Sequence, residues 1–116
     1  MAEWTEEYDL DGLDSDFLAI RSLFVSGHIK KMKQLEKQSP TKIASLLGLN
    51  YNSYHEKLKF PESFTAYHIN LLAFSCRLDP NIIHNVIQAE IKTRVQAANK
   101  KYYDKQKQSK AKSLEK

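Results

Sequence analysis

The side chains best suited to recognising a partner are clustered in a short stretch that begins at Asn50. Tyr54 and Leu58 are four residues apart, so in a helix they share one apolar face. The other side of that helix then carries an amide, an imidazole, a carboxylate and an ammonium group, on Asn52, His55, Glu56 and Lys59. These groups can donate or accept hydrogen bonds. The spacing therefore predicts a short helix whose polar side is presented to a partner.

A second short helix is predicted directly before this one. Ser39 is suited to capping a helix that begins at Pro40, where the missing backbone N–H is no loss. Gly48 suits the left-handed conformation that ends a helix, and Asn50 is a natural cap for the next one. Inward-facing residues are expected at Ile43, Ala44, Leu46, Leu47 and Leu49. Residues 39–58 therefore predict two helices joined by a tight turn.

This stretch resembles the helix-turn-helix of the phage-repressor family, which comprises Cro and XRE-like, lambda-repressor-like domains. The resemblance is carried by the small residue Ala44, by the turn glycine Gly48, and by apolar residues at Ile43, Leu47, Leu49 and Tyr54. It covers roughly residues 29–91. The sequence departs from the family pattern at two positions. Lys57 stands where the late residue of the second helix is usually apolar, and Pro40 stands where Gln is frequent.

The resemblance implies a protein that binds double-stranded DNA, with the second helix of the pair in the major groove. It implies that base edges are read by Tyr51, Asn52, His55 and Glu56. It also implies phosphate contacts from Ser39, Thr41, Lys42, Lys57 and Lys59. Asn can bond adenine through two groups, and Glu can accept a hydrogen bond from cytosine N4. Two alternatives stay open: Tyr51 completes the inner face, and an unmatched Glu56 is repelled by phosphates.

Two functions follow from this interpretation. The first is a transcriptional regulator, expected to act as a homodimer because a single module contacts few base pairs. The second is a protein-interaction adaptor or antitoxin-like partner that keeps the fold without reading bases. In that case the polar side of the second helix is only solvated or meets another protein.

Catalytic and metal-binding patterns are absent from the sequence. It contains no glycine-rich phosphate loop, no Cys-x-x-Cys and no His-Glu-x-x-His. The histidines are far apart in sequence, at His28, His55, His68 and His84. The single cysteine, Cys76, excludes an intramolecular disulfide and is expected in the core. We therefore expect no enzymatic activity, no cofactor, no metal and no small-molecule substrate.

Charge is distributed unevenly along the chain. Residues 1–16 contain seven acidic residues and no Lys or Arg, whereas the rest contains all 18 basic residues and the other seven acidic ones. A basic body suits a polyphosphate partner, although Lys-rich tails also serve solubility alone. The separation of charge leads to a further hypothesis, that residues 3–16 lie over the basic face and compete with DNA.

The apolar spacing predicts an all-α fold, a compact bundle of about five to six short helices with an extended C-terminal helix. The expected helices span Asp14 or Ser15 to Val25, about His28 to Gln38, the pair in residues 39–58, Thr65 to Leu78, and a last one from Pro80. The predicted division is an acidic, disordered head at residues 1–12, a lambda-repressor-like domain at 13–98, and a basic helix end and tail at 99–116, mobile beyond about Lys105.

The last helix carries one apolar stripe that is longer than a compact domain requires. Its members are Ile83, Ile87, Ile91, Val95, Ala98 and Tyr102. We expect its second half to pack on the N-terminal helix or against a second copy of the protein. No apolar run approaches the ~20 residues of a membrane span, and the acidic N-terminus is unlike a signal peptide. A cytoplasmic protein without membrane contact is therefore expected.

Overall fold

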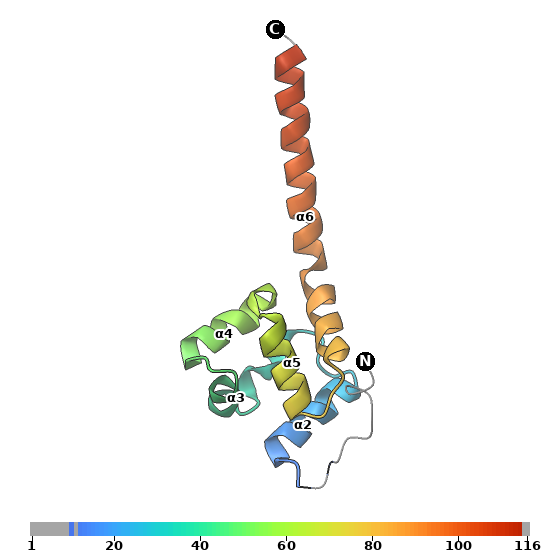
Figure 1. Ribbon diagram of the computed structural model, residues 1–116. Coiled ribbons are helices and arrows are strands. Elements are labelled where there is room, and N and C mark those ends of the chain that lie inside the picture. The colour runs from blue at the N-terminus through green and yellow to red at the C-terminus, as the bar shows by residue number, and fades with distance from the viewer. Residues whose placement is uncertain (1–9, 11, 115–116) are drawn as a thin grey trace.

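The computed structural model describes Leu10 and residues 12–114, with side chains as far as Gln108. The fold is all-α, as the sequence predicts, and the long last helix stands out from a group of short ones (Figure 1). The elements are α2 (Ser15–Val25), η1 (Met32–Lys37, a 3₁₀ helix), α3 (Pro40–Leu46), α4 (Tyr51–Lys59), η2 (Pro61–Ser63, a 3₁₀ turn), α5 (Ala66–Ser75) and α6 (Pro80–Leu114).

The helix α2 has the bounds that the sequence predicts. Its first turn is capped by Asp14, whose Oδ1 accepts a hydrogen bond from the backbone N–H of Asp16 at 2.8 Å. Ile20 and Phe24 are buried, and they fix the side of α2 that faces the core.

The segment after α2 is not the α-helix predicted over residues 28–38. Only Met32–Lys37 is helical, and it is a 3₁₀ helix. The side chain of Gln34 binds the backbone of the preceding loop: its Oε1 accepts from the N–H groups of Lys30 (2.6 Å) and Lys31 (2.8 Å), and its Nε2 donates to the carbonyl of His28. These bonds replace the helical ones there. The predicted inward residues are nevertheless all buried, namely Ile29, Met32 and Leu35.

The helix pair α3–α4 forms as predicted, with one exception at its start. Ser39 is in the left-handed region (φ 48°), and its side chain makes no cap hydrogen bond, so the predicted capping by Ser39 is wrong. Gly48 takes the predicted positive φ of 71°. The backbone N–H of Leu49 returns to the carbonyl of Ala44 at 2.9 Å. Asn50 then caps α4 by accepting from the N–H of Ser53 at 2.7 Å.

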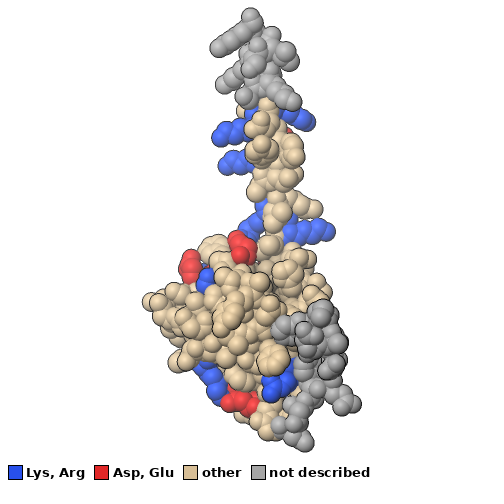
Figure 2. All heavy atoms as spheres, viewed as in Figure 1, with Lys and Arg blue, Asp and Glu red and all other residues tan. Residues whose placement is uncertain are grey.

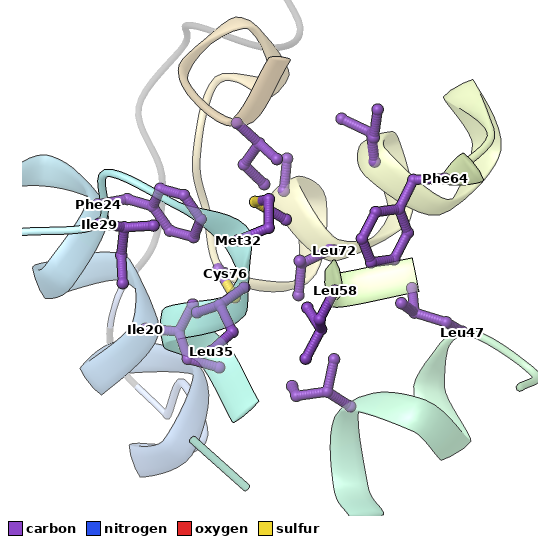
Figure 3. Close-up of a cluster of buried hydrophobic side chains, with 14 of the residues drawn as sticks. Ile20, Phe24, Ile29, Met32, Leu35, Leu47, Leu58, Phe64, Leu72 and Cys76 are labelled. Atoms are coloured by element: carbon purple, nitrogen blue, oxygen red, sulfur yellow. The ribbon is translucent and has the colours of Figure 1, made fainter. Parts of the chain in front are cut away.

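The core joins α2, η1, α3, α4, α5 and the start of α6 (Figure 3). Tyr54 and Leu58 of α4 are fully buried in it. Cys76 is buried as well, as predicted, and burial raises the pKa of its thiol to about 12. A thiol with that pKa stays protonated at neutral pH and does not act as a nucleophile.

The helix α5 begins where predicted and ends earlier. The Oγ1 of Thr65 accepts from the N–H of His68 at 3.1 Å, and the Nδ1 of His68 accepts from the N–H of Thr65 at 3.3 Å. The helix stops at Ser75 instead of Leu78 because Arg77 adopts a positive φ of 57°. The predicted inward set, Ile69, Leu72, Ala73 and Cys76, is buried.

The helix α6 leaves the domain and gives the molecule its extents of 71 × 33 × 23 Å (Figure 1). Ile83 and Ile87 are buried, whereas the side chains of Val95 and Tyr102 are 56% and 58% exposed. The expectation that the N-terminal helix covers the second half of the stripe is therefore wrong. The helix also continues to Leu114, past the predicted start of a mobile tail, because this stretch contains no Gly or Pro and is rich in Lys and Gln, which favour helix.

A substitution at Tyr54 tests the packing of α4. The Tyr54 hydroxyl is buried and has no hydrogen-bond partner among the described residues, and burial raises its pKa above the ordinary value. An unpaired buried hydroxyl costs about 1 kcal/mol or more. Tyr54→Phe should therefore raise the free energy of unfolding by about 1 kcal/mol in urea denaturation. Leu58→Ala, a control in the same helix, should lower it by about 2–5 kcal/mol. A loss in Tyr54→Phe as large as in the control would contradict this packing.

Candidate nucleic-acid interface

The outward side of α4 carries the polar residues that the sequence predicts there. Asn52, Glu56 and Lys59 are exposed, and the side chain of Tyr51 is 51% exposed. The alternative that Tyr51 completes the inner face is therefore wrong. Because Tyr54 and Leu58 are buried on the opposite side, α4 cannot rotate without exposing apolar surface. The direction of this polar face is fixed by the core.

His55 is less accessible than the sequence analysis expects. Its side chain is half-buried, and its ring lies against that of Tyr51, with 4.2 Å between the ring centroids. The ring of Tyr54 meets it edge-on at 5.9 Å. Its Nε2 atom is buried and has no hydrogen-bond partner in the described part of the chain. The prediction of a fully presented His55 is wrong, because the ring packs between two aromatic neighbours.

The first turn of α3 holds the phosphate candidates Ser39, Thr41 and Lys42. Thr41 and Lys42 are exposed, but the Nζ of Lys42 is bound by two carboxylates of the α2 N-terminus. It lies 2.5 Å from Asp14 Oδ2 and 2.9 Å from Asp16 Oδ2. These hydrogen bonds hold the pKa of both carboxyl groups below the usual range and raise the pKa of Lys42.

The Lys42 cluster bears on two of the sequence predictions. A hydrogen bond from the Ser39 side chain also helps to lower the pKa of Asp16, so Ser39 faces the same acidic residue. The positive charge predicted for phosphate at this helix end is thus neutralised from within the chain. The same contact bears on the hypothesis that residues 3–16, the acidic head, lie over the basic face. Asp14 and Asp16 belong to this head, and both bind Lys42, a predicted phosphate contact. Residues 1–9 and 11 lie outside the described residues.

The two lysines near the end of α4 differ in their surroundings. The Nζ of Lys57 donates to the backbone carbonyl of Ser63 at 2.8 Å, and the side chain is half-buried. It therefore holds the η2 turn against α4. Lys59 is exposed. Of this pair, Lys59 is the residue whose surroundings suit a phosphate contact.

One contact at the far end of α4 has no signal in the sequence. Arg94 of α6 forms a bidentate ion pair with Glu62 of η2, in which Nη2 and Oε1 lie 2.8 Å apart. Arg94 also lies over the ring of Phe60, 5.8 Å from its centroid. The hydrogen bond from Arg94 lowers the pKa of Glu62. This contact fixes α6 beside the turn that follows α4.

The remaining candidates for chemistry stay dispersed. Within residues 10 and 12–114, no group of three or more His, Cys, Asp or Glu residues is arranged to hold a metal ion. None of the described helices combines the length and apolar content that crossing a bilayer requires. Comparison with protein-family models, curated proteins and solved structures gives no match for this chain. The outward face of α4 is the surface on which Asn52, Glu56 and Lys59 lie exposed together.

A titration tests the neutralisation of Lys42. Lys42→Gln should raise the pKa values of Asp14 and Asp16 toward the ordinary value near 3.9, because the hydrogen bonds and charge of Lys42 are the largest causes that lower them. In the unsubstituted protein, the small stabilisation from these pairs is present at neutral pH and is lost as the pH falls below about 4. The pKa values of both carboxyl groups are measured by NMR of the carboxyl carbons over a range of pH. Lys59→Gln removes the same charge and should leave both values unchanged; equal effects of the two variants would refute a local contact.

Proposed function

We propose that this protein binds double-stranded DNA through the outward face of α4 and acts as a regulator of transcription. The observation that carries the proposal is the pairing of α3 with α4 across the Gly48 turn, which leaves Asn52, Glu56 and Lys59 exposed on a rigidly held helix. A helix held in this way presents the same hydrogen-bonding groups each time it meets a partner. Preorganisation of this kind lowers the entropic cost of binding.

The size of α4 suits the major groove. Its nine residues span roughly 13 Å at 1.5 Å per residue, and a helix with its side chains is about 10–12 Å wide, close to the ~12 Å width of that groove. In such a complex the amide of Asn52 is placed to bond adenine, and the carboxylate of Glu56 to accept from cytosine N4. Tyr51, half-exposed at the first turn, would contact a base or sugar. His55 would act mainly by packing against the ring of Tyr51.

The phosphate contacts in this proposal come from the two ends of the helix pair. Thr41 is exposed in the first turn of α3, and Lys59 is exposed in the last turn of α4. Lys42 joins them only when phosphate displaces Asp14 and Asp16, and Lys57 only when it leaves the carbonyl of Ser63. Exposed ion pairs are weak, about 0–1 kcal/mol, so such an exchange is accessible.

The proposal includes a homodimer. Val95 and Tyr102 lie on the stripe that begins with the buried Ile83 and Ile87, and both are more than half exposed. A second copy that covers this stripe would place two α4 helices in one assembly. Two-fold assembly lets a small module read two half-sites about one DNA turn apart.

A protein-interaction adaptor is the second candidate. One observation in its favour is that Lys42 and Lys57 already bind groups of this chain, which leaves fewer charges available to phosphate. Another is that the aromatic rings of Tyr51 and Phe60 are exposed at opposite ends of α4. An adaptor would bind DNA weakly and without sequence preference. It would form a stable complex with another protein through the same face.

Selection of preferred duplexes from a random pool, followed by binding to the selected sequence, separates the two functions. Asn52→Ala should weaken binding to the selected duplex by about 1–3 kcal/mol and leave binding to unrelated duplexes unchanged. Lys59→Gln should weaken binding to both, because phosphates carry no sequence information. Asn81→Ala, which removes an exposed amide from the first turn of α6, is the matched control and should change neither. Failure to enrich any sequence, or an Asn52→Ala variant with unchanged preference, would refute the proposal.

A further inference from the structure

The C-terminal part of α6 forms a surface that the proposed function of α4 does not use. The ion pair between Arg94 and Glu62 ties the helix to η2. From Val95 to Gln108, every residue is exposed. This length of helix therefore meets solvent on all sides, and its properties come from its own side chains.

The charges on this part of α6 are almost all of one sign. Within residues 95–108, the basic residues are Lys100, Lys101, Lys105 and Lys107, and the single acidic residue is Asp104. None of the four lysines forms an ion pair or hydrogen bond with another described residue. In the view of Figure 2, the Lys and Arg side chains project from the protruding helix, while most of the visible surface of the globular part is uncharged.

These lysines form two rows along the helix. At 100° per residue, Lys100 and Lys107 lie within about 20° of each other, and Lys101 and Lys105 within about 40°. The two rows are roughly 130° apart around the helix axis. Between them lie Ala97, Asp104 and Gln108, which line one shallow depression together with Lys100, Lys101 and Lys105.

The positive charges on this part of α6 are only partly balanced, because Asp104 is the one carboxylate among the four lysines. Lys101 and Lys105 are four residues apart, where like charges repel by a few tenths of a kcal/mol. Residues 95–108 carry four lysines and one aspartate, a net charge of +3, so this surface is strongly biased to one sign. A polyanion that runs along both rows relieves the repulsion and gains from release of its counterions.

The spacing of the rows selects the kind of polyanion. The lysine rows stand on the two flanks of a cylinder about 10–12 Å wide. The phosphates of duplex DNA form two ridges that border a major groove about 12 Å wide. An extended acidic peptide offers one line of charge and satisfies one row at a time, whereas a duplex groove meets both.

We propose that residues 97–108 of α6 are a second, sequence-independent binding surface for duplex DNA, with the lysine rows on the phosphates of the two strands. The surface is independent of base reading by α4. It lies on the opposite side of the helix from Val95 and Tyr102, so a second copy of the protein on the apolar stripe leaves it free. Asp104, between the rows, weakens binding by repelling phosphate.

The test compares two full-length variants that lose the same charge. In one, Lys100, Lys101, Lys105 and Lys107 are changed to Gln. In the other, the exposed lysines of the η1 region are changed to Gln, namely Lys30, Lys31, Lys33 and Lys37. Binding to a duplex of arbitrary sequence is measured over a series of salt concentrations. Each phosphate contact contributes about 0.9 to the slope of log affinity against log salt.

The α6 variant should lower the magnitude of that slope by about 3 to 4, and should bind roughly tenfold or more weakly at moderate salt. The η1 variant should change the slope by less than half as much. Asp104→Asn should tighten binding severalfold on every duplex. An unchanged slope in the α6 variant, equal slopes in the two lysine variants, or selective loss of binding to poly-glutamate in place of DNA would each overturn the proposal.

The outcome also separates this surface from the function proposed for α4. If the α6 variant keeps its slope while Asn52→Ala loses sequence preference, α4 reads DNA and the α6 surface does not bind it. If the salt slope of the α6 variant falls while Asn52→Ala keeps its sequence preference, the α6 surface binds DNA and α4 does not read it. An unsubstituted protein that binds no duplex at low salt refutes both.

Discussion

The burial of Tyr54 and Leu58 is the constraint on which the rest of this structure depends. Both side chains are almost fully removed from water, and they hold one side of α4 against η1, α3 and α5. Burial of the Leu58 side chain contributes roughly 1.5–3 kcal/mol, and the ring of Tyr54 adds further buried apolar surface. The other side of α4 must then face outward. That orientation decides which side chains of α4 a partner can meet.

Much of this arrangement could be predicted from local chemistry. Gly48 and Asn50 act over a few residues, so the turn and the start of α4 follow from residue type. The burial of Ile29, Met32 and Leu35 could be predicted too, although not the kind of helix. A spacing of three residues fits a 3₁₀ helix and an α-helix alike, and the choice depends on the reach of the Gln34 side chain.

The features that could not be predicted join residues that are far apart in the sequence. Lys42 meets Asp14 and Asp16 across 28 and 26 positions, and Arg94 meets Glu62 across 32. Similarly, Ile87 and Val95 belong to one apolar stripe, and nothing in their types indicates that the domain ends between them. Only the packing of the other elements decides which part of α6 is covered.

These long-range contacts leave the lysine of α3 paired with carboxylates, whereas the described lysines near the end of α6 are not. At α3, the carboxylates of Asp14 and Asp16 bind the ammonium group of Lys42, which a phosphate would otherwise meet. On α6, the lysines between residues 100 and 107 have no such partners in the described chain. In the proposed complex, attraction to the duplex therefore comes mainly from α6 and Lys59, whereas α4 supplies selectivity through Asn52. Because α6 supplies most of the attraction to the duplex in this proposal, the outward face of α4 can remain nearly neutral.

The most direct measurement is an NMR search for intermolecular nuclear Overhauser effects between the side-chain amide of Asn52 and the protons of a selected duplex. We expect contacts from this amide to base protons in the major groove, with the buried ring of Tyr54 unchanged. Contacts confined to α6, or a free Asn52 amide in a saturated complex, would contradict the claim that α4 is the reading helix.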